Sequence, residues 1–334
     1  MTPEETLRWL TGLRNLGSRL GVDRMRLLSA RIGNPERAQP CFHIAGTNGK
    51  GSTSAMIEAI QRAQGRRTGL YTSPHLVAIG ERIQVDRTPL SDTAVVALAE
   101  RLRPHYEAIR AEDPENAPTF FELITAAALL EFAERKVDVA ILETGLGGRL
   151  DATNTVQPLA AAVTQIGFDH QEFLGDSLAS IAGEKAGIYK SGAVAVVGEA
   201  RPDVCALLTA RAEEARAEPV LVTGRDWQVR EVSVGSAGTS FTLVTSDGER
   251  RLTTPLIGEF QAHNAGVALA MLRGAGGRWL EIERNAAALL PGVRLAGRFH
   301  RADRWLFDVA HNADGAATVV ANLLEVGAPL PVSA

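Results

Sequence analysis

Short apolar segments alternate with amphipathic helical segments along most of the chain. An apolar run that lacks polar residues on either side is typical of a strand in a parallel sheet covered by helices on both faces. Runs of this kind predict strands at residues 41–45, 67–71, 137–142, 160–166, 193–197 and 220–223. The alternation predicts an α/β fold with a doubly wound, mostly parallel sheet. A functional site is expected at the carboxyl ends of its strands.

The remaining periodicity predicts helices and a small antiparallel subsheet. Helices are expected at residues 4–30 (with a break near Gly17 and Gly21), 91–111, 119–136, 176–190, 258–271 and 314–326. Residues 227–254 alternate in the manner of strands around Asp247-Gly248, a hairpin turn. After a linker at residues 291–297, two short strands precede the last helix. We expect one large domain at residues 1–292 and an incomplete C-terminal α/β domain at residues 293–334, which is near the smallest size that can bury a core.

Composition narrows the class of protein. The formal charge of the 334 residues is −4, so no broad basic field favours nucleic acid. The two cysteines, Cys41 and Cys205, lie far apart and have no metal-type spacing, which fits a reducing cytoplasm. No apolar run approaches the roughly 18 residues of a membrane span, and the N-terminus lacks a signal-like apolar region. We expect a soluble, cytoplasmic protein that binds neither nucleic acid nor membrane.

A glycine-rich loop follows the first predicted strand and leads into a helix. Its residues are Gly46-Thr47-Asn48-Gly49-Lys50-Gly51-Ser52. Such a loop presents backbone N–H groups and a helix N-terminus to an anion, with a lysine as a point charge and a hydroxyl beside a metal. It departs from G-x-x-x-x-G-K-[ST] by one glycine between the lysine and the serine. The pattern predicts phosphate binding. The glycines at residues 145–154 do not have dinucleotide-binding spacing, and no helix begins cleanly there.

Polar residues follow several of the other predicted strands. Glu143 ends the strand at residues 137–142, where enzymes of this class hold magnesium, and Ser73 and His170 occupy comparable positions. Lys185 lies on a predicted helix among small and apolar neighbours. Glu122 has capping-box spacing with Thr119, so a structural role explains it equally well.

Sequence motifs occur in a fixed order over nearly the whole chain. They are HIAGTNGKGS (43–52), TSPHL (72–76), ERI (81–83), TFFE (119–122), LETGLGGRLDATN (142–154), DH (169–170), GEKAGI (183–188), HN (263–264), GR (297–298) and DVAHN (308–312). In this combination the chain resembles the folylpolyglutamate synthase and dihydrofolate synthase family of bacteria, within the Mur ligase superfamily. Gly51 and the TSPHL motif favour this folate branch over the peptidoglycan Mur ligases.

The resemblance implies an ATP-dependent ligase of folate biosynthesis and one-carbon metabolism. ATP would phosphorylate a substrate carboxylate, and the amine of L-glutamate would then displace phosphate from the acyl phosphate. The acceptor would be a folate or dihydropteroate, and the protein a monomer with a P-loop in a Mur ligase-like central domain. Two alternatives remain open: a Mur-type amino-acid ligase with another acceptor, and a nucleotide- or folate-binding protein that does not ligate.

The resemblance also assigns roles to residues. It implies that ATP is bound by ten residues: Thr47, Asn48, Gly49, Lys50, Gly51, Ser52, Asn264, Arg298, Asp308 and His311. Implied to hold two magnesium ions are Ser52, Ser73 and Glu143 at one site and His170 at the other. Implied to act in catalysis are Lys50, His170 and Lys185, the last as a carbamate. Implied to line the folate site are Arg82, Phe121, Glu122 and Asp151.

The chain departs from the family pattern in two places. The family's AHNP is here Ala310-His311-Asn312-Ala313, a mild change at a helix start. Family members also continue well beyond the position of residue 334, so we expect the C-terminal domain to be incomplete and ligation to be slow. Three points are left open: whether the acceptor is dihydropteroate or tetrahydrofolate, whether Lys185 is carbamylated, and whether residue 334 is a natural end.

Overall fold

A mixed β-sheet forms the centre of the structure. In the computed structural model, which describes residues 2–16 and 20–327, this sheet has eight strands in the order β4-β3-β2-β5-β1-β6-β7-β8. The six strands β2, β5, β1, β6, β7 and β8 run parallel to one another. Strands β3 and β4 extend the sheet beyond β2 in antiparallel pairing. The bounds are β1 Cys41–Ala45, β2 Thr68–Tyr71, β3 Ile83–Val85, β4 Thr88–Pro89, β5 Val139–Glu143, β6 Ala160–Val163, β7 Val194–Val197 and β8 Val220–Val222. The predicted doubly wound, mostly parallel sheet is confirmed.

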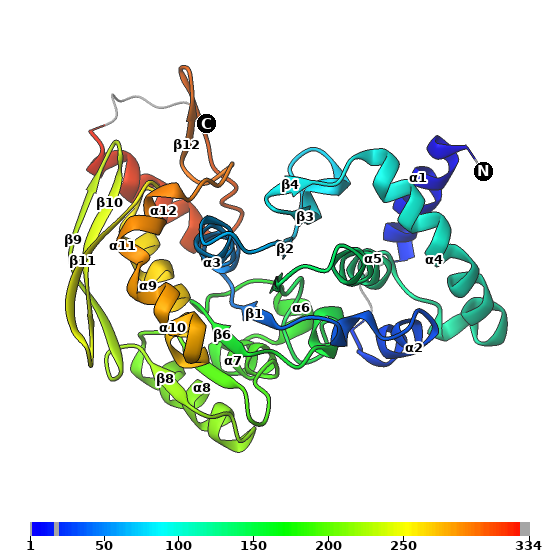
Figure 1. The fold of residues 1–334 in the computed structure, drawn as a ribbon, viewed down its shortest axis with the longest axis horizontal. Helices are drawn as coiled ribbons and strands as arrows, with labels where there is room; N and C mark the ends of the chain where they lie inside the picture. Colours follow the sequence, from blue (N-terminus) through cyan, green and yellow to red (C-terminus); the bar gives the residue numbers. More distant parts are fainter. Residues whose placement is uncertain (1, 17–19, 328–334) are drawn as a thin grey trace.

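Helices cover both faces of this sheet (Figure 1). Alternate residues of β1 show the division: Phe42 and Ile44 enter the core beneath α3 and α9, whereas Cys41 and Ala45 face the helices of the other side. The first face carries α3 Lys50–Ala63, α9 Glu259–Ala275, α10 Gly277–Arg284 and α11 Ala286–Leu289. The second carries α1 Pro3–Gly12, α2 Asp23–Arg31, α4 Asp92–Glu112, α5 Phe120–Glu134, α7 Leu178–Ala186 and α8 Pro202–Glu214.

Some helices differ from the sequence prediction. The helix expected at residues 4–30 is divided into α1 and α2, and Gly21 lies between them as predicted; Gly17 lies outside the described residues. Helices α8, α10, α11 and the short α6 (Gln171–Leu174) were not predicted. In α8 only a narrow stripe is buried, because Val204, Leu208 and Ala212 are the residues that face the sheet. Short 3-10 turns occur at Leu13–Leu16, Pro35–Arg37, Ile79–Arg82, Pro114–Asn116, Ala152–Thr155 and Leu290–Gly292.

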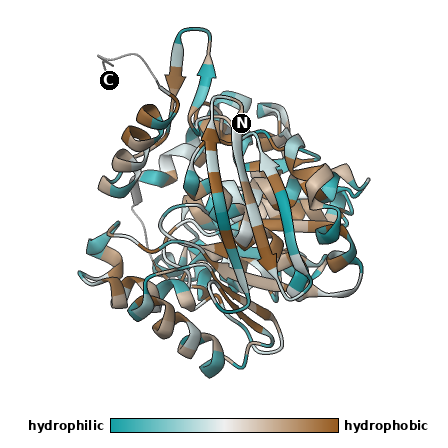
Figure 2. Ribbon diagram, turned by 90° about the vertical axis from the view of Figure 1, so that its left-hand side faces the viewer, coloured by the Kyte–Doolittle hydropathy of each residue, from teal (hydrophilic) through white to brown (hydrophobic). Residues whose placement is uncertain are grey.

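The predicted antiparallel subsheet is present and packs on α9. Its strands are β9 Trp227–Gly235, β10 Gly238–Thr245 and β11 Gly248–Thr254, in the order β11-β10-β9. Apolar and polar residues alternate along these strands in Figure 2, as expected for a sheet with one buried face. Trp227, Phe241 and Leu252 lie in the same core as α9. This core joins the subsheet to the central sheet.

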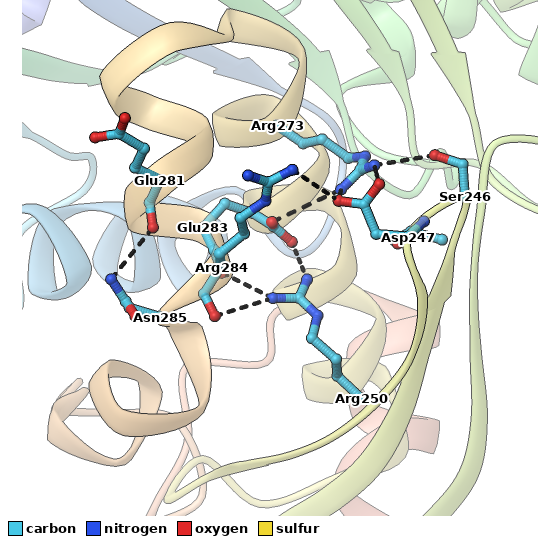
Figure 3. A network of polar contacts seen from close by, with 9 residues as sticks. Ser246, Asp247, Arg250, Arg273, Glu281, Glu283, Arg284 and Asn285 are labelled. Atoms are coloured by element: carbon cyan, nitrogen blue, oxygen red, sulfur yellow. Dashed lines mark hydrogen bonds and ion pairs between the residues drawn. The ribbon is translucent and has the colours of Figure 1, made fainter.

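Charged side chains also attach the subsheet to α9 and α10 (Figure 3). Arg250 of β11 contacts the carboxylate of Glu283, whose side chain is 1% exposed. Arg273 Nη2 of α9 lies 2.7 Å from Asp247 Oδ1 in the β10–β11 turn, and Arg284 Nη2 lies 3.4 Å from Asp247 Oδ2. The network therefore ties a hairpin turn to two helices.

The C-terminal segment consists of a short hairpin and one helix. In the described part of the chain, β12 His300–Ala302 and β13 Trp305–Phe307 pair with each other and with no further strand. Trp305 is 59% exposed. Helix α12 (Ala313–Glu325) leans on the rest of the protein through Asn322, which donates to Ile257 O at 3.4 Å. The predicted domain division after residue 292 stays a prediction.

Over residues 2–16 and 20–327, no helix combines the length and apolar character that would let it cross a membrane.

Candidate functional site

The glycine-rich loop connects β1 to α3 at the carboxyl edge of the sheet. Helix α3 begins at Lys50, and no side chain caps its first turn, in which Ser52 is buried. The first N–H groups of an uncapped helix need an external acceptor, and together with the helix dipole they favour an anion. Thr47 anchors the loop, since its hydroxyl donates to Gly167 O at 3.1 Å and accepts from Gly167 N at 3.0 Å. The strand, loop and helix predicted here are therefore present.

Two glycines of the loop are required by its conformation. Gly46 has φ +150° and Gly49 has φ +92°, which L side chains rarely adopt. A Cβ on Gly46 would collide with the Thr164 hydroxyl, and one on Gly49 with the side-chain amide of Asn264 from α9. Asn264 therefore lies directly against the loop. Its Nδ2 donates to Gln261 Oε1 at 3.2 Å, so Gln261, which the sequence did not single out, orients it.

Lys50 folds back on its own loop. Its Nζ donates to Gly46 O at 2.9 Å and to Thr47 O at 3.0 Å. Burial lowers the pKa of Lys50, while the negative charges of Glu143 and Asp169 oppose that shift. To reach a bound phosphate, the ammonium would exchange these two carbonyl oxygens for phosphate oxygens.

Glu143 lies at the end of β5, beside the first turn of α3. Its side chain is buried, and its Oε2 accepts from Ser73 N at 3.3 Å. Burial raises the pKa of Glu143, and the positive charges of Lys50 and Arg298 oppose that rise. A Cβ added to Gly51 would lie 3.6 Å from Glu143 Oε2 and 3.8 Å from Arg298 Nη2. One carboxylate and two cations therefore surround the start of α3.

Lys185 reaches the same loop from α7. It is 4% exposed, and its Nζ donates to Gly46 O at 3.0 Å. The Gly46 carbonyl thus accepts from two lysines. Burial, followed by the positive charge of Lys50, lowers the pKa of Lys185 to about 7. A large share of this side chain is therefore an uncharged amine at neutral pH.

Asp169 is a site residue that the sequence reasoning passed over in favour of its neighbour His170. Asp169 Oδ2 lies 3.4 Å from His311 Nε2 and 3.5 Å from Asn312 Nδ2, both from the C-terminal segment. Burial opposes the shift, but the charge of His170, the bond from Asn312 and the charge of His311 together lower the pKa of Asp169. Asn312 Nδ2 also donates to Asn48 Oδ1 at 3.2 Å. The DH motif was the available signal, and Asp169 is the member that faces the loop.

Two predicted residues are less integrated into this cluster. His170 has φ +49° and is half exposed, and its Nε2 lies 3.7 Å from Asp169 Oδ1. Asp308 holds a local turn, because its carboxylate accepts from Phe299 N and Ala310 N, both at 2.8 Å. His311 comes close to the loop through Asp169, whereas the Asp308 carboxylate is occupied within its own segment.

The predicted magnesium ligands offer hard oxygen atoms. Over residues 2–16 and 20–327, no three His, Cys, Asp or Glu side chains are grouped as a metal site. The predicted set of Ser52, Ser73 and Glu143 has one carboxylate and two hydroxyls. Magnesium usually takes one or two carboxylates and completes its shell with water and substrate phosphates. Glu143, buried with one long hydrogen bond, fits that role.

Two of the predicted folate residues contact the loop that follows β5. A Cβ on Gly145 would collide with the Phe121 ring, so this ring packs directly on the loop. Asp151 Oδ2 accepts from Gly145 N at 3.0 Å and from Leu146 N at 2.8 Å. Arg82 is buried, and its Nε donates to His75 Nδ1 at 2.9 Å. The structure thus brings Phe121 and Asp151 together at one loop.

Glu122 and Glu81 hold the neighbouring backbone. Glu122 Oε2 accepts from Thr119 N at 2.7 Å, so the capping box is formed, and its Oε1 accepts from Arg24 Nε at 2.9 Å. The carboxylate of Glu122 therefore caps α5 and pairs with Arg24. Glu81 accepts from three successive N–H groups, those of Leu76, Val77 and Ala78. The ERI motif contained this residue, but its structural task becomes visible only in the fold.

Comparisons with known proteins cover most of the chain. Residues 44–272 match the Mur ligase middle domain. The dihydrofolate synthase/folylpolyglutamate synthase of Bacillus subtilis (strain 168) is 38% identical over 324 residues, which are 93% of this chain and 74% of that protein. The apo form of the L. casei folylpolyglutamate synthase superposes with a TM-score of 0.89 at 31% identity, covering 97% of this chain and 80% of that one. A folylpolyglutamate synthase complex with AMPPCP and folate gives 0.85 at 31% identity, with the same coverages.

These similarities extend over both the loop region and the sheet that supports it. The matched Mur ligase segment begins within β1 and ends within α9, and so contains the glycine-rich loop, Glu143, Lys185 and Asn264. A relative at 38% identity that is covered over 74% of its length shares the fold and the family. The chain belongs to the folylpolyglutamate synthase/dihydrofolate synthase family of ATP-dependent ligases, within the Mur ligases.

Proposed function

We propose that this chain uses ATP to activate the carboxylate of a folate and joins it to the amine of L-glutamate. The observation that carries the proposal is the convergence of Lys50, Glu143 and Lys185 on the glycine-rich loop and the uncapped start of α3 that follows it. A site for phosphoryl transfer needs alignment and charge neutralisation more than covalent chemistry. The relatives in complex with AMPPCP, an ATP analogue, and with folate support this choice of substrates.

The first step would transfer the γ-phosphoryl group to the acceptor carboxylate, giving an acyl phosphate and ADP. The N–H groups at the start of α3 would bind the phosphates, and Lys50 would place its charge on the transferring group. Asn264 and Arg298 border the same loop and are proposed to contact the nucleotide. His311 is proposed to do so from the C-terminal segment, through its position beside Asp169.

In the second step the glutamate amine would attack the acyl carbon. The C–N bond forms as the C–O bond to phosphate breaks, and inorganic phosphate leaves with the electron pair. The amine loses its proton. Binding both reactants at one sheet edge supplies the proximity on which such a step depends. We propose that a single chain performs both steps as a monomer.

Ser52, Ser73 and Glu143 would hold a magnesium ion, and His170 is proposed to serve a second one. The fit rests on Glu143, a buried carboxylate at a strand end with a single 3.3 Å hydrogen bond. Bound magnesium would neutralise charge on the phosphate oxygens. The half-exposed position of His170 leaves it free to turn toward a ligand, and this assignment needs the test described below.

Lys185 is proposed to be carbamylated. An uncharged amine reacts with carbon dioxide to give a carbamate and one proton, whereas an ammonium does not. With its pKa at about 7, Lys185 supplies the uncharged amine at neutral pH. The product would place a negative charge beside the glycine-rich loop, since Lys185 Nζ lies 3.0 Å from Gly46 O and the charge of Lys50 acts on it.

The proposal is tested by phosphate release from ATP. Wild-type chain is assayed with dihydropteroate or with tetrahydrofolate, in the presence and absence of L-glutamate. Release that requires both acceptor and glutamate supports ligation, and the acceptor that supports it identifies the substrate. Phosphate release that does not need glutamate, or that neither dihydropteroate nor tetrahydrofolate supports, would contradict the proposed ligation. In the same assay Lys50→Ala should lower turnover by at least about 10²-fold, because Lys50 stabilises charge in the transition state. Unchanged turnover in a folded Lys50→Ala variant would remove nucleotide chemistry from this loop.

A further inference from the structure

His43 is a buried histidine in the middle of β1 that the proposed mechanism does not use. It is 0% exposed, and its Nε2 lies 2.8 Å from Thr153 Oγ1. Its Nδ1 has no hydrogen-bond partner within the described residues. A buried polar atom without a partner is costly, so its retention needs an explanation. The side chain points to the same face of the sheet as Cys41 and Ala45, toward the loop at residues 145–153.

The hydrogen atoms around Thr153 can be assigned one by one. Thr153 Oγ1 lies 2.5 Å from Asp151 Oδ1, and Thr153 N donates to the same oxygen at 3.0 Å. A threonine hydroxyl has one hydrogen, and an ionised carboxylate only accepts. The hydroxyl therefore donates to Asp151, and its contact with His43 must be a bond that it accepts. His43 then carries its proton on Nε2.

The charge of His43 agrees with this assignment. Burial, and then the positive charge of Lys190, lowers the pKa of His43 to about 3, so the ring is neutral and has a single N–H. Burial raises the pKa of Asp151, but bonds from Thr153, Leu146 and Gly145 oppose that rise. These donors stabilise the carboxylate form of Asp151 against the burial that raises its pKa.

The Asp151 carboxylate connects this chain of bonds to the loop after Glu143. Its Oδ1 receives the Thr153 hydroxyl, while its Oδ2 receives the N–H groups of Gly145 and Leu146. Without the Thr153 hydroxyl, Oδ1 would keep only the bond from Thr153 N, and the carboxylate that holds the turn at residues 145–146 would be fixed less firmly. Phe121 packs on that turn. The relay therefore ends at the side of the site that the folate acceptor is proposed to occupy.

We propose that His43 and Thr153 are positioning residues that lock the carboxylate of Asp151 for acceptor binding. His43 Nε2–H donates to Thr153, and the Thr153 hydroxyl donates to Asp151. The inference rests on the proposed function in one respect, the placement of the folate acceptor beside Asp151. The unpaired Nδ1 of His43 is the cost of holding the ring in one tautomer.

The test compares two threonine variants that each remove one hydroxyl donated to a buried carboxylate. Thr153→Val breaks the relay at the carboxyl edge of the sheet. Thr68→Val is the matched control, because Thr68 Oγ1 donates to the buried Glu58 at 2.9 Å at the amino end of β2. Thr153→Ser keeps the hydroxyl and serves as the conservative variant. Binding of dihydropteroate and of tetrahydrofolate is measured by calorimetry, so the result does not depend on turnover.

Thr153→Val should weaken acceptor binding about tenfold or more, because a hydrogen bond to a charged group is lost. ATP binding should remain unchanged, Thr153→Ser should stay near wild type, and Thr68→Val should lose stability without losing acceptor affinity. Nitrogen-15 NMR of His43 should show the Nε2–H tautomer in the wild type and a shifted tautomer signal in Thr153→Val. An Nδ1–H tautomer, or equal acceptor affinities in Thr153→Val and Thr68→Val, would overturn the inference. Absence of acceptor binding by the wild-type chain would instead overturn the proposed function, and with it the placement of Asp151.

Discussion

Replacing Lys185 by methionine should stabilise the protein while abolishing ligation. Methionine has a similar length and no charge, so it fills the space of Lys185 without the cost of a buried ammonium. Folding moves the pKa of this lysine from 10.5 to about 7, mainly through burial. At pH 7 this shift lowers the unfolding free energy of the wild type by about 4 kcal/mol, a cost that the variant does not have. The lost bond to Gly46 O offsets roughly 1 kcal/mol of this gain.

The pH dependence gives the sharper measurement. Above pH 7 the folded lysine has released its proton, whereas the unfolded lysine keeps it up to pH 10.5, so the unfolded state binds more protons. The stability of the wild type therefore rises with pH relative to Lys185→Met. The difference between the two proteins should shrink by about 2 kcal/mol from pH 7 to pH 9. Urea unfolding in buffers freed of carbon dioxide measures it at each pH.

Carbon dioxide provides the functional half of the assay. Added bicarbonate should raise the ligase activity of the wild type and leave Lys185→Met inactive, because only an amine forms the carbamate. A stability difference that stays constant from pH 7 to pH 9 would show that Lys185 does not titrate near neutrality, and the reasoning would be wrong. Activity of Lys185→Met close to that of the wild type would refute the carbamate proposal separately.

Two further predictions concern the metal site and the attachment of the subsheet. Glu143→Gln should strongly raise the magnesium concentration needed for half-maximal activity, because Glu143 is buried at the strand end. His170→Ala should raise that concentration less. Magnesium titrations that match the wild type in both variants would contradict the two-site proposal. Arg250→Met should lower the free energy of unfolding by about 3 kcal/mol, because it leaves the carboxylate of Glu283 buried with only a distant cation. Urea unfolding measures this loss, and Arg284→Met is the control. The exposed contact of Arg284 with Asp247 in the same network (Figure 3) should contribute less than about 1 kcal/mol. Equal losses of unfolding free energy in the two variants would refute the argument.

The sequence by itself was enough to predict the fold class, because parallel strands buried on both faces must be apolar throughout. The run at Val139–Glu143 and its neighbours carry this signal directly, and the sheet was predicted from them. The glycine-rich loop was equally readable, since a phosphate loop depends on local backbone conformation and on residue types at fixed spacing. Gly49, with φ +92°, shows why a glycine stands there. The family resemblance followed from the order of such local motifs.

The helices that the sequence missed show the limit of periodicity. In α10, Trp279 and Ile282 are buried between charged residues, and only their packing beneath α9 makes the segment a helix. Local pattern gives a weak signal where few residues are buried, because the stability of such a helix comes from tertiary contacts. Within residues 4–30, by contrast, Gly21 marked the break between α1 and α2 directly in the sequence.

The tertiary structure decided which side chains act together. Asp169 and His311 are 142 positions apart in the chain, and Thr153 and His43 are 110 apart, yet each pair is in contact. Sequence spacing carries no information about such pairs, because the carboxyl ends of parallel strands meet only after the sheet has formed. The lowered pKa of Lys185 has the same origin, since it depends on burial and on the charge of Lys50. Residue types and local loop conformations can be predicted from the sequence. Protonation states and side-chain contacts depend on the fold, because it brings distant segments together.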